Sequence, residues 1–219
     1  MLMNLFSIFD PSSYFFLQLN WMSMLIILFI FPQMMWTSNS IMSVFFYKML
    51  NFLMLEMSII FKNKNNMIMF LTLFMLIFLN NLLGLIPYVF NITSHLMFSL
   101  TFSLTLWISF MLFGWINKTN HMFIHLVPKS TPPILMPFMV LIESISNFIR
   151  PYTLAIRLSA NMIAGHILLS LMGNSMKNSS FIIGFILIQN LLMILELSVT
   201  FIQAYVFSIL SILYANESN

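Results

Sequence analysis

Ionisable and amide side chains recur at regular spacing within an apolar tract in the C-terminal half of the chain. Glu143, Arg150 and Arg157 follow one another at intervals of seven residues, and Asn147 and Asn161 occupy the intervening steps of three and four. On a helix this spacing places all five side chains on one face, which drifts by about 20° per heptad. The pattern therefore predicts an apolar helix with one polar, charged stripe.

A second polar stripe follows in the next apolar tract. Gln189, Glu196 and Gln203 are also seven residues apart, and Thr200 lies between the last two. A charged side chain near the bilayer centre costs about 2.5–3.5 kcal/mol even on the mildest scale, so such groups face an interior, a cavity or a partner. Two adjacent stripes indicate a route for ions. The alternative is a set of buried salt bridges that hold helices together, although such pairs are often no more stabilising than apolar replacements.

The order of these groups along the first tract is informative about the ion. Glu143 comes early, His166 comes late, and Arg157 lies between them, nine residues before the histidine. Histidine and desolvated glutamate side chains can exchange protons near neutral pH, whereas arginine does not deprotonate and acts as a fixed positive charge. A titratable site near each surface with a cation between them is what two offset proton half-channels require.

The composition excludes a soluble protein. Of the 219 residues, 61% are hydrophobic and 6% are charged, whereas about 25% of residues are charged in ordinary soluble domains. We therefore expect an all-α polytopic membrane protein in which residues 1–219 form a single membrane domain. The net charge of +3 includes lysines scattered singly between apolar runs, so no nucleic-acid binding is expected, and the absence of cysteine excludes disulfides and thiolate metal sites.

The apolar runs predict about five membrane crossings. Three are of ordinary length and two are much longer: 15–36, 67–88, 96–117, 131–173 and 181–214. The segment 41–61 carries Lys48 and Glu56 at mid-length, so we expect it to lie at the interface as an amphipathic helix.

The two long tracts should form a tilted hairpin, which occupies about 131–214. As helices they would be roughly 60 and 50 Å long at about 1.5 Å per residue, against a hydrocarbon core of roughly 30 Å. They are joined by the polar turn GNSMKNSS, and Pro151 should kink the first of them because it removes one backbone hydrogen bond.

The register of this hairpin has two possibilities. In one, Glu196 faces Arg157 and neutralises it. In the other, which we favour because it leaves the arginine free to meet an external carboxylate, Gln203 faces Arg157, Glu196 lies near His166, and Glu217 lies near Glu143.

Small residues on the first long helix would let another membrane helix approach closely. They are Ala155, Ser159, Ala160, Ala164 and Gly165. Ordinary packing between helices would also account for them.

Lysine distribution predicts the orientation in the membrane. With five crossings, one side of the membrane carries all but one of the lysines: Lys48, Lys62, Lys64, Lys118 and Lys129, against Lys177 alone on the other. By the positive-inside rule the lysine-rich side is the matrix or cytoplasm, so the N-terminus lies outside and the C-terminus inside.

The start of the chain resembles neither a secretory signal nor a transit peptide. Its 25 phenylalanines and 22 methionines, with abundant Ile, Leu and Asn, suggest AT-rich coding DNA, as in an organelle genome.

Several segments together resemble the subunit a family of the rotary (F-type) ATP synthase in its mitochondrial, insect-type form. They are NLFSIFDPS, NNLLGLIPY, HLVPKSTPPILMPFMVLIESISNFIRP, LAIRLSANMIAGH and AYVFSILSILY, and they span nearly the whole chain. The resemblance implies a multi-pass protein of the mitochondrial inner membrane, in contact with lipid, whose tilted hairpin lies against a rotating ring of c subunits. It also implies other stator subunits as partners, within a complex that is expected to be dimeric.

The resemblance assigns roles to individual residues. Arg157 matches the essential arginine that stabilises the ionised carboxylate of the ring and blocks direct passage between the half-channels. Gln203 matches its partner, and Asn161 the polar residue one turn along. His166 and Glu196 match the half-channel through which protons enter.

The remaining acidic residues match the exit toward the matrix. These are Glu143 and, near the C-terminus, Glu217. Arg150 is not invariant in the family, so we expect an exit-side charge or a headgroup contact. ATP chemistry is expected elsewhere, since no phosphate-binding glycine loop is present.

Other functional classes also fit parts of the sequence. A stand-alone secondary transporter, or a membrane assembly subunit that transports nothing, would also be apolar, but transporters often show internal repeats and none is visible. His121 and His125 have the spacing of a metal or haem pair but lack acidic or cysteine neighbours. A solvated interfacial loop fits them better, so no metal and no cofactor are expected.

Overall fold

The computed structural model describes residues 5–12, 18–25, 40–61, 64–86, 89–127, 132, 134–176 and 182–218. Within these ranges every regular element is helical, which confirms the all-α class. The α-helices are α2 (Ile41–Ile60), α3 (Lys64–Leu85), α4 (Leu96–Asn117), α5 (Thr119–Leu126), α6 (Met136–Met176) and α7 (Ile182–Ser218). Two short 3-10 helices, η1 (Leu5–Phe9) and η2 (Leu19–Met22), precede them.

Five of the described helices are long and apolar enough to cross a membrane: α2, α3, α4, α6 and α7. The polytopic class is thereby confirmed, but the set differs from the expected one. The expected first span, 15–36, lies mostly outside the described residues, and its described part includes η2. By length and composition α2 could cross the membrane, so its expected interfacial position stays a prediction.

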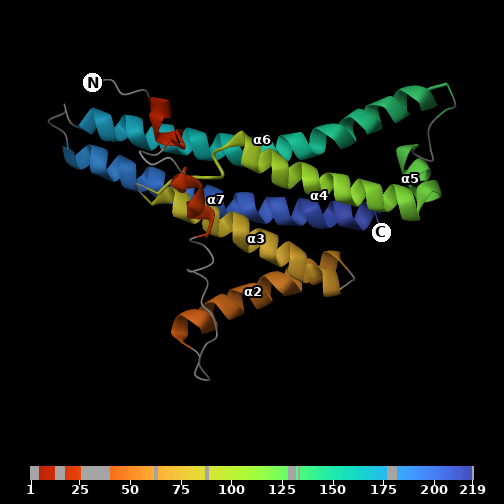
Figure 1. Cartoon of the computed structure of the whole chain (residues 1–219), viewed down its shortest axis with the longest axis horizontal. Helices are drawn as coiled ribbons and strands as arrows, with labels where there is room; N and C mark the ends of the chain where they lie inside the picture. Colours follow the sequence, from red (N-terminus) through yellow and green to blue (C-terminus); the bar gives the residue numbers. More distant parts are fainter. Residues whose placement is uncertain are drawn as a thin grey trace.

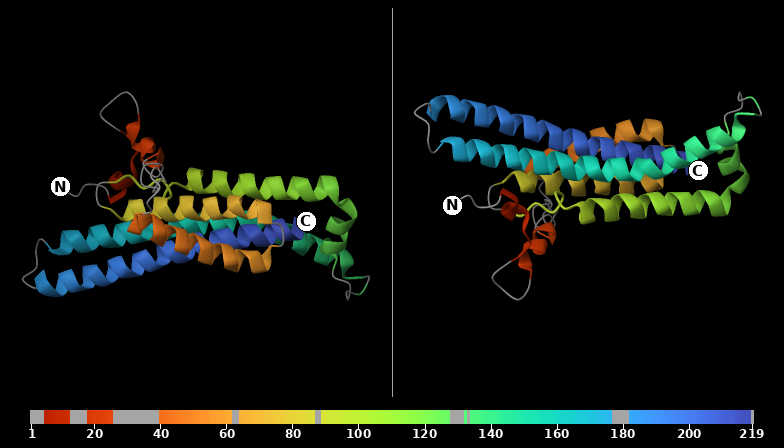
Figure 2. Two further views of the ribbon diagram at one scale, coloured as in Figure 1. Left: turned by 90° about the horizontal axis from the view of Figure 1, so that it is seen from below. Right: turned by 90° about the horizontal axis from the view of Figure 1, so that it is seen from above.

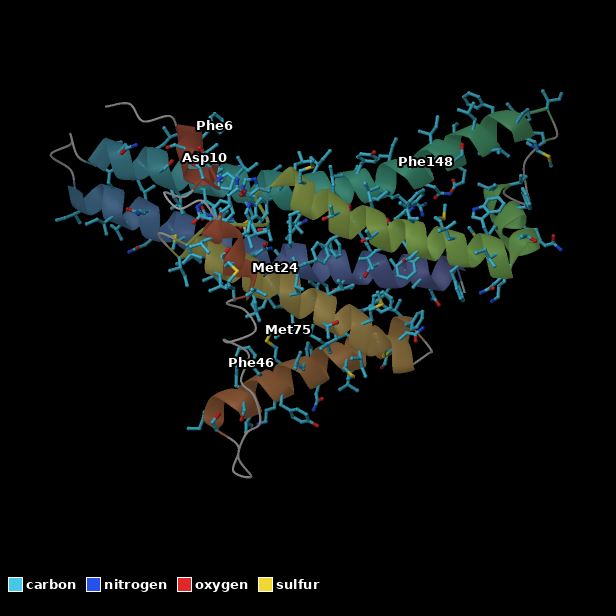
Figure 3. The ribbon with its side chains drawn as sticks, in the orientation of Figure 1. Phe6, Asp10, Met24, Phe46, Met75 and Phe148 are labelled. Carbon is cyan, nitrogen blue, oxygen red and sulfur yellow. The ribbon has the colours of Figure 1, made fainter. Side chains whose placement is uncertain are left out.

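The expected long hairpin is confirmed. α6 has 41 residues and α7 has 37, which corresponds to roughly 60 and 55 Å of helix. The two helices lie side by side in both views of Figure 2. Pro151 lies inside α6 without ending it, and Figure 1 shows that α6 changes direction in its first half. Phe148, three residues before the proline, lies near this bend (Figure 3).

The apolar core lies where α3 packs between α2 and α7. Phe74 of α3, Met57 of α2 and Phe207 of α7 are at most 2% exposed. Ala204 and Ser208 of α7 are fully buried, and such small side chains let two helices approach closely. This packing holds α7, and with it the second polar stripe, at a fixed rotation.

Buried hydroxyl groups on α7 find their hydrogen-bond partners within the helix. Ser208 Oγ donates to the carbonyl of Tyr205 at 2.9 Å, and Thr200 Oγ1 donates to that of Leu197 at 2.7 Å. These bonds remove the cost of burying a polar group, so hydroxyl residues can stand at close helix contacts. The amide and carboxyl side chains of the stripes have no such local partner.

α6 is held from one side by α4 and from another by α7. Ser99 and Ser103 of α4 are buried, as are Ala155 and Ser159 of α6, so small side chains are found on both helices of this pair. The helix ends lie at two opposite ends of the molecule. Figure 1 shows the start of α3, the end of α4 and the C-terminus at one end, and the close of α6 with the start of α7 at the other.

Candidate functional site

Arg157 lies on the outward face of α6. Its side chain is exposed, as is that of Asn161 one turn later, whereas Leu154 and Leu158 are at most 4% exposed on the inward face. Among the described residues none forms an ion pair or a hydrogen bond with Arg157. A guanidinium on the surface of a membrane helix requires a partner of opposite charge or a polar cavity. This face is therefore suited to a second chain that carries a carboxylate.

Two contacts fix the register of α6 against α7. Asn161 Nδ2 donates to Gln203 Oε1 at 3.4 Å, and Gln203 is 5% exposed. A β-carbon built on Gly165 would lie 2.9 Å from the Glu196 carboxyl carbon, so Glu196 packs directly on Gly165. Both contacts disagree with the register in which Glu196 faces Arg157, and the Gly165 contact agrees with the favoured register, in which Glu196 lies near His166. Gln203, which was expected opposite Arg157, is hydrogen-bonded instead to Asn161, one turn farther along α6.

Glu196 is a buried acid without a described partner. Its side chain is 8% exposed, and no described group hydrogen-bonds to either carboxyl oxygen. An unpartnered buried acid is costly for stability alone, which makes it a candidate for function. Gly165 supplies the space, because any larger residue there would overlap the carboxyl group.

His166 is held by an asparagine from the loop between α3 and α4. Asn91 Oδ1 accepts from both Thr93 N, at 3.2 Å, and Thr93 Oγ1, at 2.7 Å, so the amide orientation is set by the backbone N–H. The Asn91 amide nitrogen then faces His166 Nε2 at 3.2 Å. An N–H donor at this position requires an unprotonated Nε2. Adding a proton to Nε2 must therefore break this contact.

Gly84 of α3 makes room for the same asparagine. A β-carbon built on Gly84 would lie 2.7 Å from Asn91 Cγ, which is closer than real β-carbons come to other atoms. Asn91 is 6% exposed, so its amide cannot simply swing into solvent. The glycine of the NNLLGLIPY segment thus positions the group that orients His166.

A cavity of about 640 Å³ opens beside His166, here called the His166 cavity. Polar side chains from four parts of the chain line it: Asp10 and Asn20 near the N-terminus, Ser170 of α6, and Gln189 and Asn190 of α7. It lies toward the end of the molecule where α6 closes and α7 begins. At roughly 30 Å³ per molecule, it has room for about twenty waters.

A smaller cavity of about 80 Å³, here called the Glu143 cavity, lies at the other end of α6. Glu143, Asn147 and Arg150 line it together with Tyr214 of α7. Arg150 Nη2 is 3.7 Å from Glu143 Oε1, and the guanidinium carbon is 5.7 Å from the centre of the Tyr214 ring. Arg150 is therefore engaged within the chain, unlike Arg157.

Three of the expected residues have side chains outside the described atoms. The side chain of Glu217 is outside the described atoms, so its expected proximity to Glu143 stays a prediction, although Tyr214, three residues earlier, reaches that cavity. The side chains of His121 and His125 are likewise not described. Among the residues that are, no cluster of His, Cys, Asp or Glu could hold a metal ion.

Sequence reasoning did not single out Asn91, Asp10 or Tyr214 as site residues. Asn91 and Asp10 lie outside the described helices, where no helical periodicity applies, whereas Tyr214 lies on α7, eleven residues after Gln203. Asn80 and Asn81 are also buried in α3, and no described group hydrogen-bonds to the Asn81 side chain. For these two a signal existed, because paired amides inside an apolar span are costly unless they have a task.

Comparison with known proteins gives matches along the whole chain. A family model described as ATP synthase A chain matches residues 15–216, a range that includes the residues of both polar stripes. ATP synthase subunit a of Drosophila yakuba is 50% identical over 228 aligned positions, and that of Anopheles gambiae is 50% identical over 230. Each alignment covers 100% of this chain and 100% of the relative.

Proposed function

Because the chain belongs to the ATP synthase A chain family, we propose that its two polar stripes conduct protons through the membrane sector of that enzyme. Its function is that of the family, the stator subunit that forms the proton channel. The observation that carries the residue assignment is the position of Arg157, exposed on α6 between the His166 cavity and the Glu143 cavity.

Protons are taken up through the His166 cavity. They pass from its polar lining to His166 and then to Glu196, whose carboxyl group packs on the neighbouring Gly165. The contact with Asn91 supports this step. His166 can take a proton on Nε2 only when Asn91 releases that nitrogen, so the site has a closed state with the contact and an open state without it. Glu196 in turn has no described partner that would hold it in one charge state.

Arg157 separates uptake from release. Its outward position suits a c-subunit ring that presents one carboxylate at a time, and its permanent charge stabilises the ionised carboxylate and repels protons. Asn161 lies one helical turn from Arg157 and is joined by a hydrogen bond to Gln203 of α7, which braces this region. A proton must then travel around with the ring, and about 2.3 kcal/mol per charge per 100 mV is available to turn it.

Release occurs through the Glu143 cavity. Glu143 lies about 21 Å along the helix from Arg157, and Glu217 is assigned to the same exit. Arg150 pairs with Glu143 and lies over Tyr214, so it shapes the exit and is not a second barrier.

The setting follows from the same assignment. We place the chain in the mitochondrial inner membrane, with the N-terminus toward the intermembrane side, the C-terminus in the matrix, and organellar DNA as its coding source. Its partners are the c-subunit ring, other stator subunits and lipid, in a complex that dimerises. ATP is made by other subunits, and no cofactor is bound by this chain. The comparisons do not favour a stand-alone transporter or a passive assembly subunit.

The decisive test replaces Arg157 in assembled membranes. Arg157→Ala should abolish proton-driven ATP synthesis, because the other arginine on that face of α6, Arg150, is paired with Glu143 and does not replace it, while native gels still show the intact complex. Arg150→Ala is the comparison variant and should lower synthesis without abolishing it, since Arg150 shapes the exit but is not the barrier between the half-channels. Normal synthesis by Arg157→Ala would refute the assigned role.

A further inference from the structure

The N-terminal segment is fastened over the His166 cavity. Asn20 Nδ2 donates to the carbonyl of Pro11 at 3.3 Å, and the His95 side chain hydrogen-bonds the backbone of Phe9. The Phe9 ring meets the His166 ring edge-on, with centroids 6.1 Å apart. Figure 3 shows Asp10 beside the short helix η1, near the C-terminal half of α6. Three separate parts of the chain thus hold this segment in place.

Asp10 shares the His166 cavity with the histidine itself. Among the described residues lining that cavity, Asp10 and His166 are the two titratable ones, and none is a lysine or arginine. Asp10 is exposed, and its Oδ1 accepts from the N–H of Ser12 at 3.2 Å. Its carboxylate therefore faces both water and the polar lining that leads to His166.

His95 does not cancel this charge. Its ring packs against those of Trp21 and Phe90, with centroids 5.3 and 5.1 Å away. Burial, the larger effect, lowers the pKa of His95 below its ordinary value of 6.5, while the hydrogen bond to the Phe9 backbone opposes the shift. The charged form of His95 is therefore disfavoured, so this ring does not offset the Asp10 carboxylate at the mouth of the cavity.

We propose that Asp10 is the proton-collecting group at the mouth of the uptake half-channel. Its carboxylate binds a proton from outside water, passes it into the His166 cavity and returns to the ionised form. Negative charge in a cleft also raises the local concentration of cations, here protons, by roughly 10-fold or more. This role rests on the proposed function, since it supplies the half-channel that ends at Glu196. The rest of the N-terminal segment positions Asp10.

The test compares Asp10→Asn with Ser12→Ala in the assembled complex. Asparagine keeps the side-chain oxygen that accepts from Ser12, so the turn is preserved, whereas the charge and the exchangeable proton are lost. Ser12→Ala keeps the charge and the backbone N–H. Proton-driven ATP synthesis is measured at mildly alkaline and mildly acidic outer pH, in weak buffer and then with added imidazole as a diffusible proton carrier.

At mildly alkaline outer pH and in weak buffer, Asp10→Asn should lower the rate by about 10-fold, the lower end of what local charge contributes. Acidic outer pH or imidazole should restore the rate, because protons then reach His166 without a collecting group. Ser12→Ala should match the unmodified complex throughout. A uniform loss at every pH, unaffected by imidazole, would show a structural role and overturn the proposal, as would an unchanged rate.

Arg157→Ala in the same membranes separates the two claims. If it is inactive while Asp10→Asn behaves like the unmodified complex, the collecting role alone fails. If Arg157→Ala itself makes ATP normally, the proposed half-channels fail as well.

Discussion

Arg150 and Arg157 have the same side chain and share one face of one helix, yet they have different surroundings. Arg150 is 34% exposed and lies 3.7 Å from Glu143, over the Tyr214 ring. Arg157 has no described ion-pair partner and faces outward. An arginine that is paired within its own chain cannot serve a passing carboxylate, whereas an unpaired one can. The difference between their proposed roles therefore rests on what each side chain touches.

Gly165 is a second position at which a single residue matters, because its missing side chain leaves the space that the Glu196 carboxyl group occupies. Alanine favours helix over glycine by about 1 kcal/mol, so Gly165→Ala should not weaken α6 by itself. Its β-carbon would instead displace the Glu196 carboxyl group, which lies 2.9 Å from that position. We expect proton-driven ATP synthesis to fall at least several-fold while the complex still assembles.

Gly173 provides the control, because nothing lies within 4 Å of a β-carbon built there. Gly173→Ala makes the same chemical change in the same helix and should leave synthesis unchanged. Equal rates for the two variants would show that Glu196 does not depend on the space at Gly165. Blue native gels establish that both variants assemble.

At the scale of the helices, the small residues of α6 divide between two surfaces. Ala155 and Ser159 are buried where α6 packs within the chain, whereas Ala160 and Ala164 are exposed beside Arg157 and Asn161. The sequence predicted that small residues on this helix allow close packing, but it did not show which neighbouring helix packs on which face. The buried pair serves the chain's own fold, and the exposed pair leaves the Arg157 face open to close approach by another helix.

α2 is also tied to the hairpin. Tyr205 donates its hydroxyl hydrogen to Glu56 Oε2 at 3.2 Å, and Asn216 Nδ2 donates to the carbonyl of Ile60 at 3.0 Å. Glu56, which suggested an interfacial helix, is thus engaged by a residue two positions from Gln203. These bonds help to fix the rotation of α7.

The hairpin register can be tested by cross-linking, and the absence of native cysteine makes the result unambiguous. The pair Asn161→Cys and Gln203→Cys should link efficiently with a short bifunctional thiol reagent, since the native side chains are in hydrogen-bond contact at 3.4 Å. The pair Arg157→Cys and Glu196→Cys should not link, because Glu196 packs on Gly165, about two turns away. Preferential linkage of the second pair would overturn the register.

For the whole molecule, the surface indicates lipid as the surrounding medium. Ile183, Leu187 and Ile194 of α7 are 66–79% exposed, and large apolar side chains are exposed along every long helix. In water a protein with such a surface would aggregate, whereas in a bilayer the lipid tails solvate these apolar side chains. The His166 cavity and the Glu143 cavity lie toward opposite ends of α6, which supports the proposed pair of offset half-channels.

Orientation can be checked by labelling single cysteines with a membrane-impermeant maleimide. Ser175→Cys, at the close of α6, should react from the intermembrane side, because the His166 cavity lies at that end. Lys118→Cys, at the end of α4, should react from the matrix side in inverted vesicles. Both residues are exposed, so reactivity depends on sidedness alone. The reverse pattern would invert the assignment of uptake and release.

The sequence by itself determined the helical class, the long hairpin and the two stripes that carry Arg157 and Glu196. These features are local, because apolar length and seven-residue spacing are properties of a single segment. Only the tertiary structure decided between the two registers, paired Arg150 with Glu143, and brought Asn91 and Asp10 to His166. The Arg150–Glu143 pair lies within α6, but the other contacts join residues 75 or more apart or side chains on different helices, so they depend on how whole helices pack. No repeat in the sequence records that packing, because it is set by the fit of the buried surfaces.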